Sequence, residues 1–118
     1  GLDISSYAVA NAKEEVRPLL QVGNANSLPF QDDTFSLVVS VTTLHNLHCF
    51  DLDKALREIE RVGKESKYIV VESYRNEGEK ANLLYWQLTC RAFHTPREWE
   101  WLYSQVGYSG DHGFIFFE

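Results

Sequence analysis

Short apolar runs alternate with helical patterns along the first two thirds of the chain. Residues 19–22, 35–41 and 67–71 are mostly aliphatic or β-branched, which is typical of buried strands. Between the last two runs, apolar residues at helical spacing behind an Asp51 cap predict a helix: Leu52, Ala55, Leu56, Ile59 and Val62. Alternating strands and helices predict a mostly parallel sheet with right-handed crossovers.

The two ends of the chain have patterns of their own. Residues 1–5 are typical of a strand end that passes into a helix capped by Ser5 or Ser6, and the helical pattern continues through residues 12–16 until Pro18. We therefore expect further residues before Gly1.

In the last third, Leu83–Leu88 suggest a helix, and a capping box at Thr95–Glu98 begins another that continues to Gly107. The aromatic run 114–117 predicts a last strand, which we expect to be antiparallel at the sheet edge. The predicted fold class is α/β: a doubly wound, mostly parallel sheet with an antiparallel C-terminal strand. We expect one domain over residues 1–118, incomplete at its N-terminal side.

Composition and charge narrow the classes of partner. A hydrophobic content of 44% in 118 residues predicts one packed core, and the formal charge of −6 argues against a nucleic-acid partner. Only two cysteines are present, Cys49 and Cys90, without the spacing of a disulfide scaffold or a zinc site. No apolar run is long enough for a bilayer and no signal peptide is recognisable, so we expect a cytoplasmic protein.

Polar residues stand where the predicted strands end. Ligands of a doubly wound sheet bind beyond the carboxyl ends of its strands, and these ends carry Asp3, Asn24, residues 40–45 and residues 72–75. A carboxylate that ends the second strand is a natural acceptor for both hydroxyls of a ribose. Asp3 is placed for this role, although a surface or helix-capping aspartate is the alternative interpretation.

Three segments, at residues 1–5, 23–35 and 38–45, are distinctive in their order and spacing. They closely resemble the class I S-adenosylmethionine-dependent methyltransferases of the small-molecule type. The resemblance covers essentially the whole chain, and its most specific part is residues 24–35. It implies a Rossmann-like sheet, S-adenosylmethionine as cofactor and a small-molecule methyl acceptor. It also implies that the first strand and glycine-rich loop of the family would lie before Gly1.

The resemblance also implies a role for each matching position on the cofactor side. Asp3 corresponds to the ribose ligand, with Ile4 beside the adenine. Asn24 stands where the family usually has an aspartate that accepts from the adenine amino group, and Ala25 where a backbone N–H meets the ring. The remaining positions are those of the methionine half and of the site-facing turn after the strand: Ser40, Val41 and His45.

Methyl transfer from a sulfonium is an in-line displacement, so alignment provides most of the rate gain. If the acceptor is a hydroxyl or amine, His45 is the first candidate for general base and Glu72 the second; a histidine that only shapes the pocket is the alternative. No metal is expected, because His45 and His48 lack a third ligand. Candidates for the acceptor pocket follow the predicted strand 67–71: Tyr74, Arg75, Trp86 and His94.

Two alternative functions remain open at this point. The chain is either a methyltransferase or a catalytically inactive remnant that acts as an interaction or dimerisation module, with a homo-oligomer formed through an exposed sheet. A nicotinamide-binding Rossmann half-domain would also suit Asp3, but residues 24–35 and the aromatic run 114–117 disfavour this class.

Overall fold

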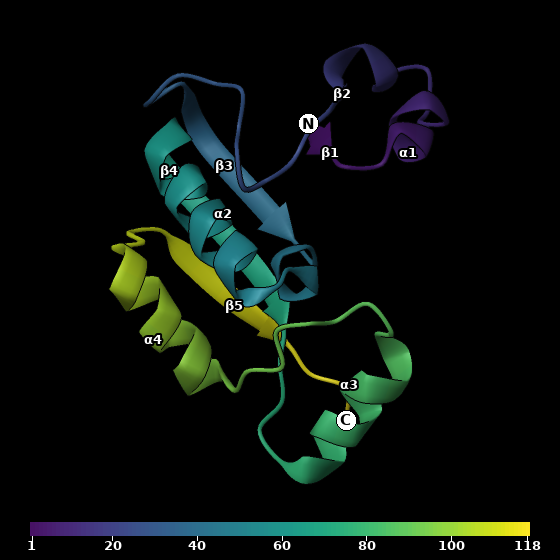
Figure 1. Cartoon of the computed structure of the whole chain (residues 1–118), viewed down its shortest axis with the longest axis vertical. Helices are drawn as coiled ribbons and strands as arrows, with labels where there is room; N and C mark the ends of the chain where they lie inside the picture. The colour runs from purple at the N-terminus through teal and green to yellow at the C-terminus, as the bar shows by residue number, and fades with distance from the viewer.

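The computed structural model describes all residues from 1 to 118 and contains two parallel sheets. A small sheet pairs β1 (Leu2–Asp3) with β2 (Gln21–Val22). A larger sheet has the order β3 (Phe35–Val41), β4 (Gly63–Glu72) and β5 (Asp111–Ile115), and all three strands run in the same direction. The small sheet lies beside β3, the strand at one edge of the larger sheet (Figure 1). The predicted α/β class with a parallel sheet is confirmed.

Helices cover one face of the larger sheet. The crossover from β3 to β4 contains the 3₁₀ turn η2 (Leu44–Asn46) and helix α2 (Cys49–Val62). Helix α3 (Glu77–Trp86) follows β4, and α4 (Pro96–Val106) leads into β5. In Figure 1, α2 and α4 lie on the same side of the sheet, whereas α3 lies beyond its carboxyl edge. None of these helices combines the length and apolar character that crossing a bilayer requires.

The hydrophobic core lies between this sheet and α2 and α4. Ile69 and Val71 of β4 have no exposed surface, and they share a cluster with Leu56 of α2 and with Trp99 and Tyr103 of α4. The opposite face of the sheet is bare: Leu37, Val39 and Val41 of β3 are 50–59% exposed. Period-two alternation along β3 separates the two faces.

The start of α4 confirms the predicted capping box. The Thr95 side chain accepts from the backbone N–H of Glu98, and the Glu98 carboxylate accepts from the backbone N–H of Thr95, with Pro96 at the first helical position. These hydrogen bonds hold the pKa of Glu98 below its usual value. The helix ends at Gly107 with φ of 71°, a left-handed conformation that glycine adopts without strain.

The prediction of an antiparallel last strand is wrong. β5 spans Asp111–Ile115 and pairs in parallel with β4. The direction follows from α4: the chain leaves β4 at the carboxyl edge, and α4 returns it to the other edge, so the next strand runs the same way. Phe116 and Phe117 lie after the strand, where they contact Arg75 and Trp86.

The boundaries of three helices also differ from their predictions, and one of them is α3, which begins at Glu77 and ends at Trp86, before Leu88. The first helix, α1 (Ser6–Ala10), is capped by Ser5 as expected but ends well before Pro18, which lies in the 3₁₀ turn η1 (Arg17–Leu19). α1 buries no residue, and so short a helix without packing does not extend. Helix α2 begins at Cys49 behind His48, so Asp51 lies in its first turn and instead accepts a hydrogen bond from Asn26.

Candidate functional site

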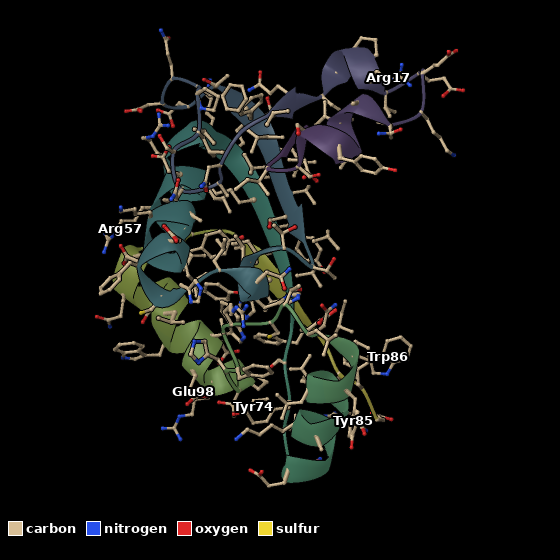
Figure 2. All side chains as sticks on the ribbon, turned by 45° about the vertical axis from the view of Figure 1, so that its right-hand side comes forward. Arg17, Arg57, Tyr74, Tyr85, Trp86 and Glu98 are labelled. Carbon is tan, nitrogen blue, oxygen red and sulfur yellow. The ribbon has the colours of Figure 1, made fainter.

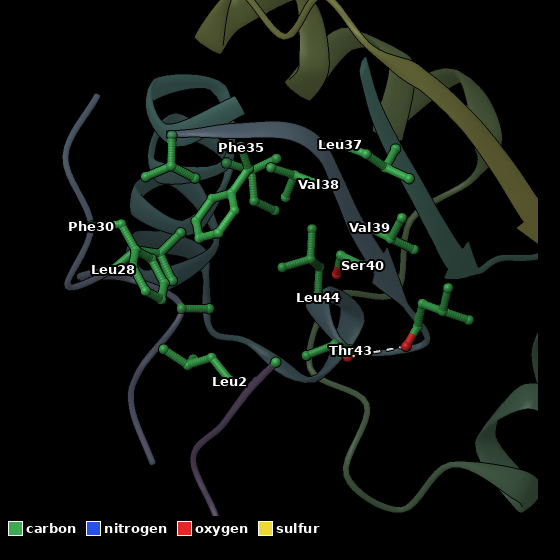
Figure 3. Close-up of a pocket in the computed structure, with 15 residues that line it drawn as sticks. Leu2, Leu28, Phe30, Phe35, Leu37, Val38, Val39, Ser40, Thr43 and Leu44 are labelled. Atoms are coloured by element: carbon green, nitrogen blue, oxygen red, sulfur yellow. Dashed lines mark hydrogen bonds between the residues drawn. The ribbon is translucent and has the colours of Figure 1, made fainter. Parts of the chain in front are cut away.

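A cavity of about 350 Å³ separates the small sheet from β3. Its walls come from four parts of the chain: the start of β1, the loop between β2 and β3, β3 with the turn that follows, and helix α2 (Figure 3). Twelve of its fifteen lining residues are hydrophobic, and its volume is that of small-molecule sites. The lining includes three residues of the predicted cofactor set: Ala25, Ser40 and Val41.

The other predicted cofactor residues lie next to this cavity without lining it. Leu2 and Leu44 are lining residues, and each directly precedes a predicted site residue, Asp3 and His45 respectively. Ile4 is 69% exposed. Asp3 pairs with Val22 in the parallel register of β1 and β2, so Asp3 and Asn24 extend from the same edge of the small sheet.

The donors and acceptors at this edge fit an adenosyl group. The Asp3 carboxylate uses Oδ1 to accept from the Ser5 backbone N–H at 2.8 Å, and its exposed position leaves Oδ2 for hydroxyl groups. The Asn24 carbonyl accepts from the backbone N–H of Asn26 at 3.0 Å. Since a carbonyl oxygen has two lone pairs, Asn24 can accept a second hydrogen bond from an amino group.

The turn after β3 is strained where it meets the cavity. Thr42 has φ of 52°, in the left-handed region that β-branched residues avoid. Its backbone N–H donates to the carbonyl of Val70 at 2.9 Å, and the Thr43 hydroxyl donates to the carbonyl of Val41 at 3.0 Å (Figure 3). These bonds hold the end of β3 in one conformation beside β4. Strain of this kind concentrates at functional sites.

The loop of residues 24–34 is fastened to α2 by one side chain. Arg61 donates to the backbone carbonyls of Phe30 at 2.7 Å and Leu28 at 3.1 Å. It also pairs with Glu58, whose carboxylate accepts from the Leu28 backbone N–H at 2.7 Å. Hydrogen bonds from Arg61 hold the pKa of Glu58 below its usual value. This clamp positions the wall of the cavity that carries Ala25 and Leu28.

His45 and Glu72, the two predicted proton acceptors, are buried against each other. His45 has no exposed surface and Glu72 is 4% exposed; His45 Nε2 lies 3.2 Å from Glu72 Oε2. The backbone N–H of Glu72 donates to His45 Nδ1 at 3.4 Å, and the Gln87 amide donates to Glu72 Oε1 at 2.9 Å. Burial lowers the pKa of His45, and the neighbouring charge of Glu72 opposes this shift. Neither side chain lines the cavity.

The four predicted acceptor-side residues are spread over the region that follows β4. Arg75 pairs with Glu79 and lies over the Phe116 ring at 4.1 Å from its centroid, and the Lys80 ammonium lies over the Tyr74 ring. Trp86 is 72% exposed and stacks on Phe117; Figure 2 shows it pointing outward from α3.

His94, the fourth of them, lies elsewhere. It packs edge-on against Trp99 and lines a separate cavity of about 550 Å³ between α2 and α4, and burial lowers its pKa. The structure therefore does not gather these four residues around the first cavity.

Sequence reasoning missed three residues that shape the site: Thr42, Arg61 and Gln87. The positive φ of Thr42 has no sequence signal, since threonine is rare in that conformation. Arg61 and Glu58 stand at i,i+3 spacing on a helix, which suggests an ion pair between them. The spacing does not predict that Arg61 also donates hydrogen bonds to a loop about thirty residues earlier. Gln87 ends α3, and its contact with β4 depends on tertiary packing.

Comparison with known proteins agrees with this geometry. Residues 1–71 match the family described as "Methyltransferase domain". Over 74 residues the chain is 39% identical to the uncharacterized methyltransferase YcgJ of Bacillus subtilis, a match that covers 62% of this chain and 28% of YcgJ. The crystal structure of YcgJ superposes with a TM-score of 0.71 and 26% identity, over 90% of this chain and 50% of that one.

Two further solved structures share the fold. One is an S-adenosylmethionine-dependent methyltransferase of Thermotoga maritima, with a TM-score of 0.67 and 23% identity over 92% of this chain and 54% of that one. The other is in the complex of the Haloferax volcanii Trm112 methyltransferase activator with its partner, with a TM-score of 0.71 and 24% identity over 91% of this chain and 49% of that one.

The parallel sheet, and a cavity that reaches the carboxyl end of β3, are those of a cofactor-binding α/β protein. The chain belongs to the methyltransferase-domain family, and S-adenosylmethionine is the cofactor that this membership implies. The chain spans about half the length of the solved relatives that it matches.

Proposed function

We propose that this chain is the cofactor-binding part of a cytoplasmic S-adenosylmethionine-dependent methyltransferase that acts on a small molecule by in-line methyl transfer. The observation that supports this most is the cavity between β1 and β3, with Asp3 and Asn24 at the neighbouring strand ends. The cavity runs along β3 and reaches the carboxyl end of this strand at Val41 and Thr43, and ligands of such sheets bind at that end.

The proposed cofactor side divides into two halves. Asp3 would accept from the ribose hydroxyls, Asn24 from the adenine amino group, and Ala25 would offer its backbone N–H to the ring beside Ile4. The backbone of Ser40 and Val41 would line the methionine half. When bound, the cofactor supplies an electrophilic methyl carbon on its sulfonium. The chain's own contribution is to hold the reacting groups in line, and the braced turn after β3 serves that alignment.

On the acceptor side, we place the small molecule beyond the carboxyl end of β4, under the segment that carries Tyr74, Arg75, Trp86 and His94. The exposed ring of Trp86 supports this, because an apolar aromatic surface there is free to cover a ligand. A proton-accepting role for His45 or Glu72 stays a prediction. The two side chains contact each other inside the protein, so neither is free to accept a proton from a ligand in this arrangement.

We also propose that an additional extended segment fills the part of this cavity that runs along β3, so that the cofactor lies at the carboxyl end of the cavity, beside Val41 and Thr43, and the domain is complete only with the segment. β3 pairs with β4 alone, and its other edge borders the cavity whose far side begins with Gly1 and Leu2. Unpaired N–H and C=O groups along such an edge, together with apolar side chains on both sides, favour a further strand.

Calorimetry with S-adenosylhomocysteine tests the proposed cofactor site. In the longest natural polypeptide that contains these residues, Asp3→Asn should weaken binding at least tenfold, because it removes a charge-assisted hydrogen bond to a ribose hydroxyl. Glu14→Gln, an exposed carboxylate before η1, is the matched control and should bind like the unchanged protein. Equal affinity of Asp3→Asn and Glu14→Gln would refute the assignment of Asp3.

A second candidate function is a catalytically inactive interaction or dimerisation module, in which the uncovered sheet face takes part. Leu37, Val39, Val41 and Tyr68 on that face are 42–59% exposed, which favours coverage by a partner or a second copy. The Haloferax volcanii protein among the fold neighbours is itself found with an activator protein. Sedimentation velocity discriminates: a homo-oligomer that Val39→Lys dissociates supports this function, and a monomer at every concentration contradicts it.

A further inference from the structure

Three polar side chains from separate elements meet inside the protein beside the candidate site. His45 comes from η2, Glu72 from the end of β4, and Gln87 from the C-terminal end of α3. The Glu72 carboxylate lies between the other two, with Oε1 2.9 Å from the Gln87 amide nitrogen and Oε2 3.2 Å from His45 Nε2. Neither His45 Nε2 nor Glu72 Oε2 makes a hydrogen bond, although both atoms are buried, so the 3.2 Å contact between them is what compensates each of them.

One hydrogen bond selects the form of the His45 ring. Nδ1 accepts the backbone N–H of Glu72, so Nδ1 carries no proton and the neutral ring has its proton on Nε2, facing the carboxylate. The lowered pKa of His45 agrees with a neutral ring. Both nitrogens are therefore engaged within the protein, and neither is directed at a ligand.

The backbone of His45 extends this connection to the segment between α3 and α4. Its carbonyl accepts the N–H groups of Arg91 at 2.8 Å and Ala92 at 2.9 Å. The buried Cys90 directly precedes Arg91, and burial, together with the Glu72 charge, raises the pKa of its thiol to about 11. The thiol thus stays neutral, and it adds no second negative charge beside Glu72.

We propose that His45, Glu72 and Gln87 form a positioning triad, which locks the turn lining the cofactor cavity to the α3–α4 segment on the acceptor side. Gln87 is the necessary third member, because its amide satisfies the carboxylate oxygen that His45 does not reach. Any effect of this lock on methyl transfer rests on the proposed methyltransferase function. The contacts among the three side chains do not depend on that function.

Nuclear magnetic resonance of the longest natural polypeptide that contains these residues, labelled with ¹⁵N, tests the triad without cofactor or acceptor. Long-range ¹H–¹⁵N correlations should show His45 with a bare Nδ1 and a protonated Nε2 at pH 7.5. Gln87→Met, of similar length but without a donor, leaves the hydrogen bond to Nδ1 and therefore the tautomer in place, and it should speed amide exchange of Arg91 and Ala92 at least tenfold. Gln105→Met, on exposed α4 surface, should leave both unchanged.

A second variant covers the case in which Gln87→Met does not fold. Glu72→Gln keeps the shape and an acceptor oxygen but removes the charge that favours a protonated ring, so it should retain the single tautomer and lower the pKa of His45 further. Mixed tautomers in the unchanged chain, or a Glu72→Gln variant whose His45 titrates as in the unchanged chain, would overturn the triad. Failure of the methyltransferase proposal would appear instead as absent S-adenosylhomocysteine binding, with these spectra unaffected.

Discussion

Thr42 is a conformationally strained residue whose replacement should stabilise the protein. Its φ of 52° lies in the left-handed region, and its side chain is exposed at the turn between β3 and η2. The bond that fixes the turn is made by the backbone N–H of Thr42 to the carbonyl of Val70, so a new side chain at this position leaves it intact. Asparagine tolerates this conformation, which makes Thr42→Asn the appropriate perturbation.

The size of the effect follows from the backbone. The left-handed conformation costs an L-residue other than Gly, Asn or Asp roughly 1–2 kcal/mol. Thr42→Asn should therefore raise the free energy of unfolding by about 1 kcal/mol. Thr42→Gly also removes the strain but adds unfolded-state entropy of roughly 0.5–1 kcal/mol, so its gain should be smaller.

Urea denaturation followed by tryptophan fluorescence measures these differences, because Trp99 is fully buried in the folded state. Asp33 provides the matched control: it has φ of 54°, but aspartate already tolerates this region, so Asp33→Asn should change stability by less than about 0.5 kcal/mol. A Thr42→Asn variant that is less stable than the unchanged protein would refute the reasoning. If the strain serves the site, Thr42→Asn will bind S-adenosylhomocysteine more weakly while being more stable.

Three further predictions concern pH, packing and the loop clamp. Burial lowers the pKa values of His45 and His94, so the unfolded chain takes up protons first; the free energy of unfolding, measured by urea titration, should be greatest above pH about 6.5 and fall as pH decreases below it. Leu56→Ala, at a fully buried position, should cost roughly 2–5 kcal/mol in the same assay, and Leu88→Ala, at an exposed one, less than about 0.5 kcal/mol. Arg61→Met should speed amide exchange in the loop before β3 and leave exchange in β4 unchanged; equal protection of that loop would contradict the clamp.

Local patterns predicted those elements whose signals are contained within a few residues. The aliphatic run of β3 and the capping box of α4 have the predicted structures. The direction of β5 was not predictable from its aromatic residues, because the direction of a strand depends on how the preceding helix returns the chain. Helix α1 ends early for a related reason: its pattern allowed a longer helix, but no tertiary contact supports one.

In the candidate site, too, local features were predictable and contacts between distant segments were not. Asp3 and Asn24 were placed at strand ends from the sequence, and the parallel pairing of β1 and β2 puts both at one edge. His45 and Glu72 were each predicted near the site, but their mutual contact joins residues 27 positions apart. Such a contact is decided by how η2 packs on β4, and a single sequence contains no local signal for it.

The two walls of the cofactor cavity are held by very different forces. No residue before Leu44 is fully buried, so the small sheet and its loops contribute nothing to the deepest part of the core. The β3 wall, in contrast, is braced by the Thr42 backbone bond and the triad around Glu72, whereas the Arg61 clamp holds the loop that joins β2 to β3. Since β1 and β2 comprise two residues each, their position relative to β3 depends on what occupies the space between them. Binding of the cofactor and filling of the part of the cavity along β3 should therefore reinforce each other, because each orders the weakly held wall that the other needs.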